Sequence, residues 1–303
     1  MTAVVTRKPD ITPGGPLGRV VVGAFMRWLR WLSPSTRRSL AFFVAQLAFA
    51  LGIRRSVALD NLKHAFPEKT DADRLEIARG VYRSLALAAI EAVTSDLLPD
   101  DELNRAVEVA DWKGLDALLD ARQPVLVASA HLGSWELFAE VMARRRYVFS
   151  AVVRPLAGAF NEWVVNNRKA AGVELILQRG ALRKMLAALE RGRAVVQLID
   201  QVLPAKDGVF VPFFGRLAST TPAVSMAARV SKAPVYVVAA VREGERLRMF
   251  VEGPVPFVDS GDRDRDLTTH TAALTAIVEG LIRKYPDQWL WLHRRWKVAP
   301  PQA

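Results

Sequence analysis

The chain has 303 residues, of which 51% are hydrophobic and 24% charged, and this composition excludes a disordered or low-complexity protein. Its 42 Lys and Arg residues outnumber its 31 Asp and Glu residues, and the net charge of +11 predicts an anionic partner such as an acidic membrane, a phosphorylated lipid or nucleic acid. The absence of cysteine excludes disulfides, cysteine nucleophiles and thiolate metal sites.

The N-terminal residues combine apolar, aromatic and basic side chains. Residues 1–16 are rich in Pro and Gly and predict a disordered leader, and the arginines in the apolar stretch that follows argue against a cleaved signal peptide. The longest uncharged run, Ser39–Ile53, has 15 residues, fewer than the roughly 17–25 of a spanning helix. We therefore predict that residues 17–55 form a helical segment that lies on an anionic membrane surface. A buried core helix and a short tilted anchor are the alternatives.

Residues 56–94 show the apolar spacing of helices. The stretch Pro67–Asp73 separates two of them, and Asp71 is the predicted N-cap of the second helix.

After Val107, apolar runs that suit strands alternate with helical patterns. The predicted strands are Pro124–Ala130, Val148–Val153, Val173–Leu177, Ala194–Ile199, Val209–Phe213 and Val235–Val241. The predicted helices are Leu137–Arg145, Phe160–Ala171, Leu182–Arg191, Pro222–Val230 and Leu267–Lys284. Strands that alternate with helices predict an α/β fold, here a single domain over residues 56–297 with a largely parallel central sheet flanked by helices. Residues 298–303 form a tail.

The most informative segment is the predicted strand Pro124–Ala130 together with the residues that follow it. His131 comes directly after the strand, at the edge where open α/β sheets bind ligands. Gly133 permits a tight turn, and Ser134 is placed to cap the next helix. Glu136 lies five positions after His131, where its carboxylate could hold the imidazole tautomer and stabilise the imidazolium. This pair suits activation of a substrate hydroxyl.

The spacing alone leaves a structural interpretation open. His131 could be a polar residue at a strand end, and the helix dipole alone could favour Glu136. Ser134 is not predicted as a nucleophile, because its surroundings lack the G-x-S-x-G pattern.

The wider sequence resembles a known family. The hexapeptide HLGSWE resembles the H-x4-D/E motif of the glycerolipid and lipid A acyltransferases. From about Arg54 to Lys297 the chain resembles the late lipid A acyltransferases, the lauroyl and myristoyl transferase family. The matching stretches are NLKHAFPE at Asn61–Glu68, VRP at Val153–Pro155, RKMLAALERGRAVVQLIDQ at Arg183–Gln201, GVFVPFFGRLASTTP at Gly208–Pro222 and YPDQWLWLHRRWK at Tyr285–Lys297.

This resemblance implies a fold like that of the glycerolipid acyltransferases and roles for particular residues. It implies that His131 is the general base, that Glu136 supports it, and that Arg154 belongs to the active site. It also implies that Asp200 lies near the acceptor site. Relatives often show D-x-D where this chain has Asp200–Gln201–Val202, so the acceptor contacts are in question.

Physical arguments support two further candidates beside the resemblance. Arg154 ends a predicted strand on the edge of His131, and its planar guanidinium could hold a phosphate or the phosphopantetheine of a carrier; a surface ion pair is the alternative. Thr221 precedes Pro222 at a predicted helix start, whose free N–H groups could bind an anion; simple capping is the alternative.

The remaining motifs give narrower expectations. The Phe-Phe-Gly sequence at residues 213–215 predicts packing and a turn, and the tryptophans and cations of residues 289–297 suit a lipid–water interface or a solvated tail. No metal-ligand spacing, Walker A motif or dinucleotide fingerprint is present, so no resident cofactor is expected.

These observations favour an O-acyltransferase at the cytoplasmic face of a bacterial inner membrane. The resemblance implies that acyl-carrier protein or acyl-CoA donates a fatty acyl chain to a hydroxyl of a lipid A precursor. Another acceptor, such as a lysophospholipid, a glycosylated phosphoinositide or an aminolipid, is the related alternative. A non-catalytic basic protein that binds anionic lipid is the alternative of a different class. Nucleic acid is not an expected partner, because the basic residues are scattered.

Overall fold

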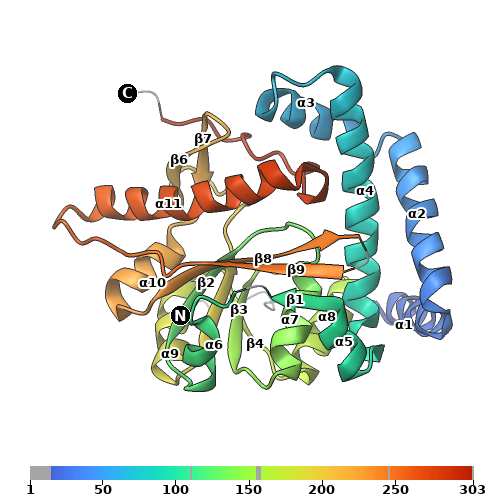
Figure 1. The fold of residues 1–303 in the computed structure, drawn as a ribbon, viewed down its shortest axis with the longest axis horizontal. Helices are drawn as coiled ribbons and strands as arrows, with labels where there is room; N and C mark the ends of the chain where they lie inside the picture. The colour runs from blue at the N-terminus through green and yellow to red at the C-terminus, as the bar shows by residue number, and fades with distance from the viewer. Residues whose placement is uncertain (1–14, 110, 155–157, 245, 302–303) are drawn as a thin grey trace, which may run out of the picture.

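A seven-stranded sheet forms the centre of the molecule (Figure 1). The computed structural model describes residues 15–109, 111–154, 158–244 and 246–301, so most of the leader expected over residues 1–16 lies outside the described residues. The strand order is β1-β9-β8-β2-β5-β3-β4, with a separate β6–β7 hairpin. The strands are β1 (Val107–Val109), β2 (Val125–Ser129), β3 (Phe149–Val153), β4 (Glu174–Leu177), β5 (Ala194–Leu198), β6 (Val209–Phe213), β7 (Arg216–Thr220), β8 (Val235–Glu243) and β9 (Arg246–Glu252).

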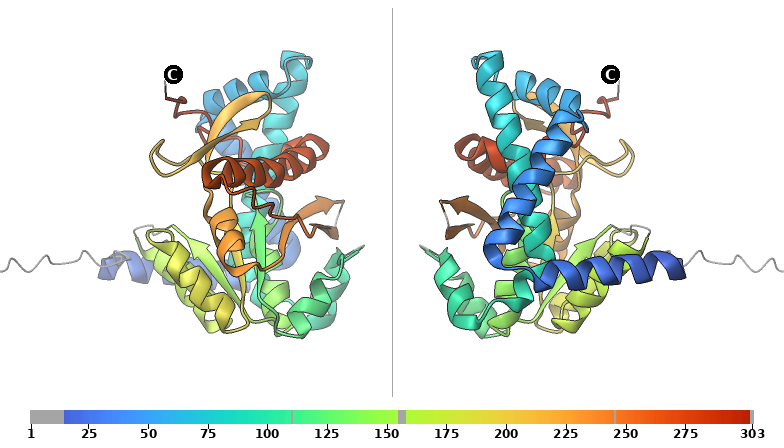
Figure 2. Two further views of the ribbon diagram at one scale, coloured as in Figure 1. Left: turned by 90° about the vertical axis from the view of Figure 1, so that its left-hand side faces the viewer. Right: turned by 90° about the vertical axis from the view of Figure 1, so that its right-hand side faces the viewer.

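Most of the sheet is parallel, as predicted. Strands β8, β2, β5, β3 and β4 run in one direction, while β9 is antiparallel to β8 and carries β1 parallel to itself. Strands β1, β7 and β9 lie outside the segments predicted to be strands. Val209–Phe213, predicted as a strand of the sheet, pairs instead with β7 in an antiparallel hairpin that packs on α11 (Figure 2).

Helices cover both faces of the sheet, which is why its central strands are buried throughout. All five residues of β2 are buried, and its four apolar residues alternate between two apolar clusters, one on each face. Helices α9, α10 and α11 contribute to one cluster, and α5, α6 and α7 to the other. The helices are α1 (Pro16–Trp31), α2 (Pro34–Ala50), α3 (Arg55–Ala65), α4 (Asp71–Thr94), α5 (Asp100–Ala106), α6 (Leu115–Asp120), α7 (Trp135–Arg144), α8 (Ala159–Ala170), α9 (Ala181–Glu190), α10 (Ala223–Ser231) and α11 (Arg263–Lys284).

The N-cap of helix α4 lies one residue earlier than predicted. The N-cap is Thr70, whose hydroxyl accepts from the Asp73 N–H, while the Asp73 carboxylate accepts from the Thr70 N–H. This reciprocal pair is a capping box, so Asp71 is the first helical residue rather than the cap.

Helices α1 and α2 leave much of their apolar surface uncovered. Helix α2 packs along α4, and α1 extends away from it across α8 (Figures 1 and 2). The side chains of Trp31 and Phe43 are 84% and 62% exposed, so these helices are not the buried core helices of the alternative interpretation. In the described residues, no single helix has the length and apolar character to cross a membrane, and α2 with α3 meets that test only as a pair bent by 86°.

Candidate active site

The predicted site residues that follow β2 and β5 lie together at the carboxyl edge of the sheet. Strands β2 and β5 are parallel neighbours, with Ser129 opposite Leu198, so the residues just beyond them meet. The His131 Nδ1 lies 2.8 Å from an Asp200 carboxylate oxygen, and the His131 backbone N–H donates to the other oxygen at 2.8 Å. The structure therefore brings together a histidine and an aspartate that are 69 residues apart.

Asp200 is held by buried donors. It is 4% exposed, and the same oxygen that accepts the backbone N–H of His131 accepts the indole N–H of Trp289 at 2.8 Å. Burial acts to raise the pKa of Asp200, but the charge of His131 and these hydrogen bonds outweigh it and lower that pKa to about 2. Asp200 is thus a buried carboxylate that stays charged at neutral pH. Both of its oxygens accept hydrogen bonds from His131, and one of them also accepts from Trp289.

The hydrogen bonds of His131 define its tautomer. A carboxylate only accepts, so Nδ1 carries the proton that Asp200 binds. The Gln201 side-chain amide nitrogen lies 3.2 Å from Nε2 and donates to it, which agrees with an unprotonated Nε2. The imidazole is about one-fifth exposed. This arrangement leaves a basic nitrogen at the accessible side of the ring.

The C-terminal segment, residues 288–297, is hydrogen-bonded to the backbone at His131. The Leu290 N–H donates to the His131 carbonyl at 3.1 Å, and the Gly133 N–H donates to the Gln288 carbonyl at 3.0 Å. Gly133 has φ of +62°, and a Cβ on it would lie 2.1 Å from the Ala240 carbonyl oxygen. The turn predicted at Gly133 is therefore confirmed, and its close approach to β8 requires glycine.

Glu136 does not contact His131 in the structure, contrary to the expectation from spacing. Its carboxylate forms an ion pair with Arg168 of α8 and accepts the Trp135 indole N–H at 3.0 Å. The Trp135 ring stands edge-on to the imidazole, with centroids 5.3 Å apart. Trp135 therefore lies between His131 and Glu136, because α7 turns the Glu136 side chain toward α8.

Ser134 is the first residue before α7, but its side chain does not cap that helix. Its hydroxyl is fully buried and donates to Glu91 of α4, whose other oxygen pairs with Arg242 at 2.5 Å. Ser134 is thus neither a cap through its hydroxyl nor exposed as a nucleophile.

The other two predicted residues directly follow β3 and β7. Arg154 is exposed directly after β3, one strand beyond β5 on the same edge, as predicted. Thr221 is 7% exposed; its hydroxyl accepts from Gln197 at 3.4 Å and from the Ala223 N–H at 3.3 Å. Helix α10 begins at Ala223, one residue later than predicted, and the observed bonds of Thr221 are those of a structural residue.

The sequence analysis missed several residues around the site, most of them in the C-terminal segment. Trp289, Trp291 and Arg295 are completely buried, so they do not lie at a lipid–water interface or in a solvated tail. His293 accepts the Val202 N–H at 3.0 Å, and burial lowers its pKa to about 4. The density of tryptophans in residues 289–297 was the signal, since tryptophans gather where area is buried.

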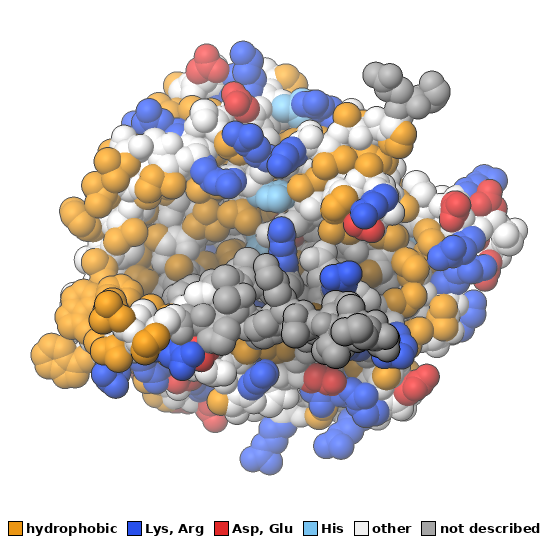
Figure 3. Space-filling view, turned by 180° about the vertical axis from the view of Figure 1, so that it is seen from behind, with side chains coloured by type: hydrophobic (Ala, Val, Ile, Leu, Met, Phe, Trp, Pro, Cys, Tyr) orange, Lys and Arg blue, Asp and Glu red, His pale blue; other side chains and the backbone are white. Residues whose placement is uncertain are grey.

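The Phe-Phe-Gly sequence has the structure that its pattern predicts. Phe213 and Phe214 are 1% and 4% exposed, and Gly215 has φ of +75°, so the Phe-Phe-Gly sequence does provide packing and a turn. Among the residues that the structure describes, no group of three or more His, Asp or Glu side chains could hold a metal ion. The site offers an imidazole nitrogen that accepts a hydrogen bond and a buried carboxylate at the other ring nitrogen. In the view of Figure 3, histidine side chains lie in a hollow bordered by Lys, Arg and apolar side chains.

Comparisons with known proteins identify the family of the chain. Residues 17–298 match the model of the bacterial lipid A biosynthesis acyltransferases. The chain is 30% identical over 253 residues to the lipid A biosynthesis palmitoleoyltransferase of Escherichia coli (strain K12), covering 82% of this chain and 80% of that protein. It is 26% identical over 252 residues to the lauroyltransferase of the same organism, with the same coverage, and 23% identical over 285 residues to its myristoyltransferase, covering 92% and 86%.

Proposed function

The chain belongs to the bacterial lipid A biosynthesis acyltransferases and is an O-acyltransferase, and from this membership we propose that it moves a fatty acyl chain from acyl-carrier protein or acyl-CoA to a hydroxyl of a lipid A precursor. The observation that carries the proposal is the contact between His131 and Asp200 at the carboxyl edge of the sheet. Family membership does not favour a different lipid acceptor or a non-catalytic lipid-binding protein.

His131 is the general base of the proposed reaction. Its Nε2 takes the proton of the acceptor hydroxyl while the hydroxyl oxygen attacks the thioester carbonyl. The tetrahedral intermediate then collapses, the carbon–sulfur bond breaks, and the imidazolium returns the proton to the leaving thiolate. The acceptor hydroxyl must first displace the Gln201 amide, which donates to Nε2 in the structure.

Asp200 is a positioning residue rather than an acceptor contact. It holds the proton on Nδ1, fixes the ring through the backbone N–H, and places a negative charge beside the imidazolium as it forms. Its burial and its third hydrogen bond, from Trp289, keep this carboxylate in one orientation. We therefore propose support of His131 as the role of Asp200, in place of the acceptor contact that the resemblance implies.

Glu136 remains a member of the proposed site through Trp135. Its carboxylate binds the indole N–H of Trp135 and so holds the ring against the imidazole. Arg168 neutralises Glu136 in the structure, and the two side chains are 26% and 16% exposed. If Arg168 turns to an anionic substrate group, Glu136 gains a free negative charge near His131.

Arg154 and Thr221 have different proposed roles. Arg154 is exposed at the same edge of the sheet, where its guanidinium can hold an anionic group of the donor or acceptor. Thr221 keeps the start of α10 in place behind the site, and its buried hydroxyl makes direct substrate binding the weaker role.

The uncovered apolar surface of α1 and α2 supports attachment to a membrane. Figure 3 shows apolar side chains gathered at the edge of the molecule where these helices lie, with Lys and Arg beside them. Aromatic and basic side chains on one surface suit the interface of an anionic leaflet. We propose that this surface places the site at the cytoplasmic face of the inner membrane, where its lipid acceptor lies.

The proposed function is tested with the full chain and its lipid products. Conversion of His131 to Ala removes the base and should lower acyl transfer by roughly 10²–10⁴-fold. Mass spectrometry of lipid A from a strain lacking the gene should show the loss of one acyl chain, which the wild-type gene restores and the H131A gene does not. Near-normal transfer by a folded H131A protein, judged by thermal unfolding, would refute the mechanism.

A further inference from the structure

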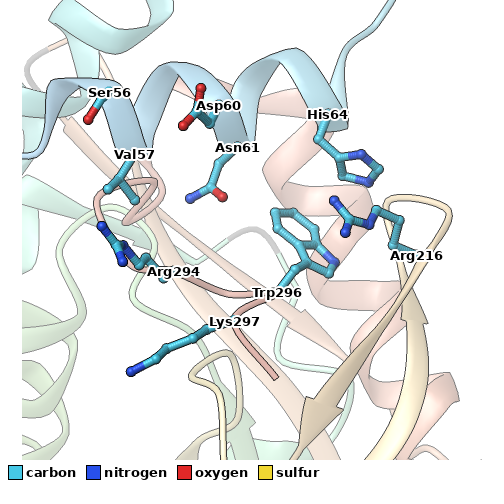
Figure 4. A pocket seen from close by; sticks show the side chains of 9 residues that line it. All are labelled: Ser56, Val57, Asp60, Asn61, His64, Arg216, Arg294, Trp296 and Lys297. Atoms are coloured by element: carbon cyan, nitrogen blue, oxygen red, sulfur yellow. The ribbon is translucent and has the colours of Figure 1, made fainter. Parts of the chain in front are cut away.

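A basic pocket lies beside the C-terminal segment. Its volume is about 280 Å³, just under the roughly 300–1,000 Å³ of pockets for drug-sized ligands, so it suits one small polar group. Side chains from α3, from the start of β7 and from the C-terminal segment converge on it (Figure 4). Three of these side chains are cations: Arg216, Arg294 and Lys297.

The three cations are not neutralised by the protein. None of them forms an ion pair within the part of the chain that the structure describes, although many other arginines do, among them Arg74, Arg144 and Arg242. The pocket holds one carboxylate, Asp60, so three positive charges face one negative charge. The surplus of two matches the charge of about −1.5 to −2 that a phosphomonoester carries at pH 7.

The rest of the pocket suits a sugar. The Trp296 indole forms a wall between Arg294 and Arg216 in the view of Figure 4, and the apolar face of a sugar ring can pack on such a surface. The His64 Nε2 lies 3.1 Å from the Phe214 carbonyl, so Nε2 carries the proton and Nδ1 can accept from a hydroxyl. Asp60 supplies a further acceptor for hydroxyl groups.

The pocket is connected to the site of the proposed reaction. Asn61 of α3 donates to the carbonyls of Trp291 at 2.7 Å and His293 at 2.8 Å, which fixes the segment between the two places. Leu290 bonds the His131 carbonyl, and Arg294 follows four residues later, so their Cα atoms are at most about 14 Å apart. One glycolipid can therefore occupy the pocket and present a hydroxyl to His131.

We propose that this pocket binds a phosphomonoester on a sugar of the acceptor glycolipid, with Arg216, Arg294 and Lys297 on the phosphate and Trp296 against the sugar ring. This inference rests on the proposed function, since it assigns a phosphorylated glycolipid as the acceptor. The pocket binds the phosphate, while His131 acts in the acyl transfer.

The kinetic test uses the double variant R216Q/R294Q and an acceptor with or without its phosphates. With the phosphorylated acceptor, the KM should rise about tenfold for each arginine removed, while kcat and the donor KM stay within twofold. With phosphatase-treated acceptor, the wild-type protein should already show the raised acceptor KM, and the double variant should have the same KM as the wild type. The matched control is R263Q, an exposed arginine at the far end of α11, which should behave as wild type.

A binding test separates the possible sources of phosphate and does not depend on transfer. Glucose 1-phosphate should bind the wild-type protein more tightly than inorganic phosphate or glucose, and the double variant should lose this preference. An unchanged KM for phosphorylated acceptor in the variant overturns the inference. Loss of binding to phosphatidylglycerol vesicles alone, with that KM unchanged, also overturns it, because the pocket would then hold a membrane phospholipid. Wild-type transfer at normal rate in these assays keeps the proposed function standing in either case.

Discussion

Replacement of Asp200 by Asn separates support of the histidine from contact with the acceptor. Three donors point at the carboxylate: two from His131 and one from Trp289. The amide oxygen of Asn can accept from the His131 backbone N–H and the Trp289 indole N–H, which share one carboxylate oxygen in the wild type. The amide NH₂ then faces the proton on Nδ1 of His131. The imidazole relieves this conflict by moving its proton to Nε2. A protonated Nε2 can no longer take the proton of a hydroxyl. We therefore expect kcat to fall by roughly 10²–10⁴-fold, the range of general-base catalysis.

The same substitution should affect stability in a pH-dependent way. Lowering of the pKa of Asp200 from 3.8 to about 2 corresponds to about 2 kcal/mol of free energy of unfolding at neutral pH. Because the folded-state pKa is the lower one, this stabilisation is present above pH 3.8 and is lost as the pH falls through about 2. The difference in free energy of unfolding between wild type and D200N should therefore shrink over that interval.

Steady-state kinetics with donor and acceptor varied separately, and urea unfolding at several pH values, measure both effects. The control is D207N, since Asp207 is exposed and should leave kcat and stability unchanged. A raised acceptor KM with unchanged kcat in D200N would show that Asp200 contacts the acceptor, and would refute the role argued from its contacts.

Four further predictions test other parts of the structure. Gln201→Glu should place a hydrogen-bond acceptor opposite Nε2 of His131 and stabilise the imidazolium, which should lower kcat at least tenfold. Gln201→Ala should change kcat less than threefold. Steady-state kinetics measure both effects. Gly133→Ala should destabilise the fold by at least about 2 kcal/mol in urea unfolding, because its Cβ would lie 2.1 Å from a carbonyl oxygen of β8. Burial lowers the pKa of His293 to about 4. The resulting contribution of His293 to the free energy of unfolding, at most about 3 kcal/mol, should be present above pH 6.5 and lost as the pH falls through 4. His293→Gln should remove this dependence of the free energy of unfolding on pH. Replacement of the exposed Trp31 and Phe43 by Ser should weaken flotation with anionic vesicles while thermal unfolding stays unchanged.

The sequence predicts the parallel part of the fold well, because its signals are local. Each predicted strand after Val107 is a strand in the structure, and the helices between them shift by a few residues at most, apart from an earlier start of α11. Strand β9, with the sequence RLRMFVE, was missed although Leu247, Met249 and Val251 are buried and alternate with more exposed residues. That alternation is the signal of a half-buried strand, and it was available in the sequence.

The partner of His131 could not be found from spacing along the chain. Glu136 is near in sequence, and its place on the first helical turn predicts a carboxylate within reach of the imidazole. The direction in which α7 leaves the strand decides otherwise, since Trp135 occupies the space beside His131 and Glu136 turns to Arg168. Asp200 reaches Nδ1 because β2 and β5 are neighbours, and strand order is a property of the whole sheet.

The C-terminal segment shows why its composition suggested the wrong location. Tryptophans and cations together are typical of a membrane interface when their polar groups have no partner inside the protein. Here the Trp289 indole N–H donates to Asp200, and the Arg295 guanidinium donates to the Ser219 carbonyl at 2.6 Å. Because the Trp289 indole N–H and both Arg295 Nη groups have partners inside the protein, these large side chains can be buried. The Arg295 Nε is buried without a hydrogen-bond partner in the described part of the chain. The buried half of the segment supports His131, and the exposed cations that remain, Arg294 and Lys297, are left to meet a ligand.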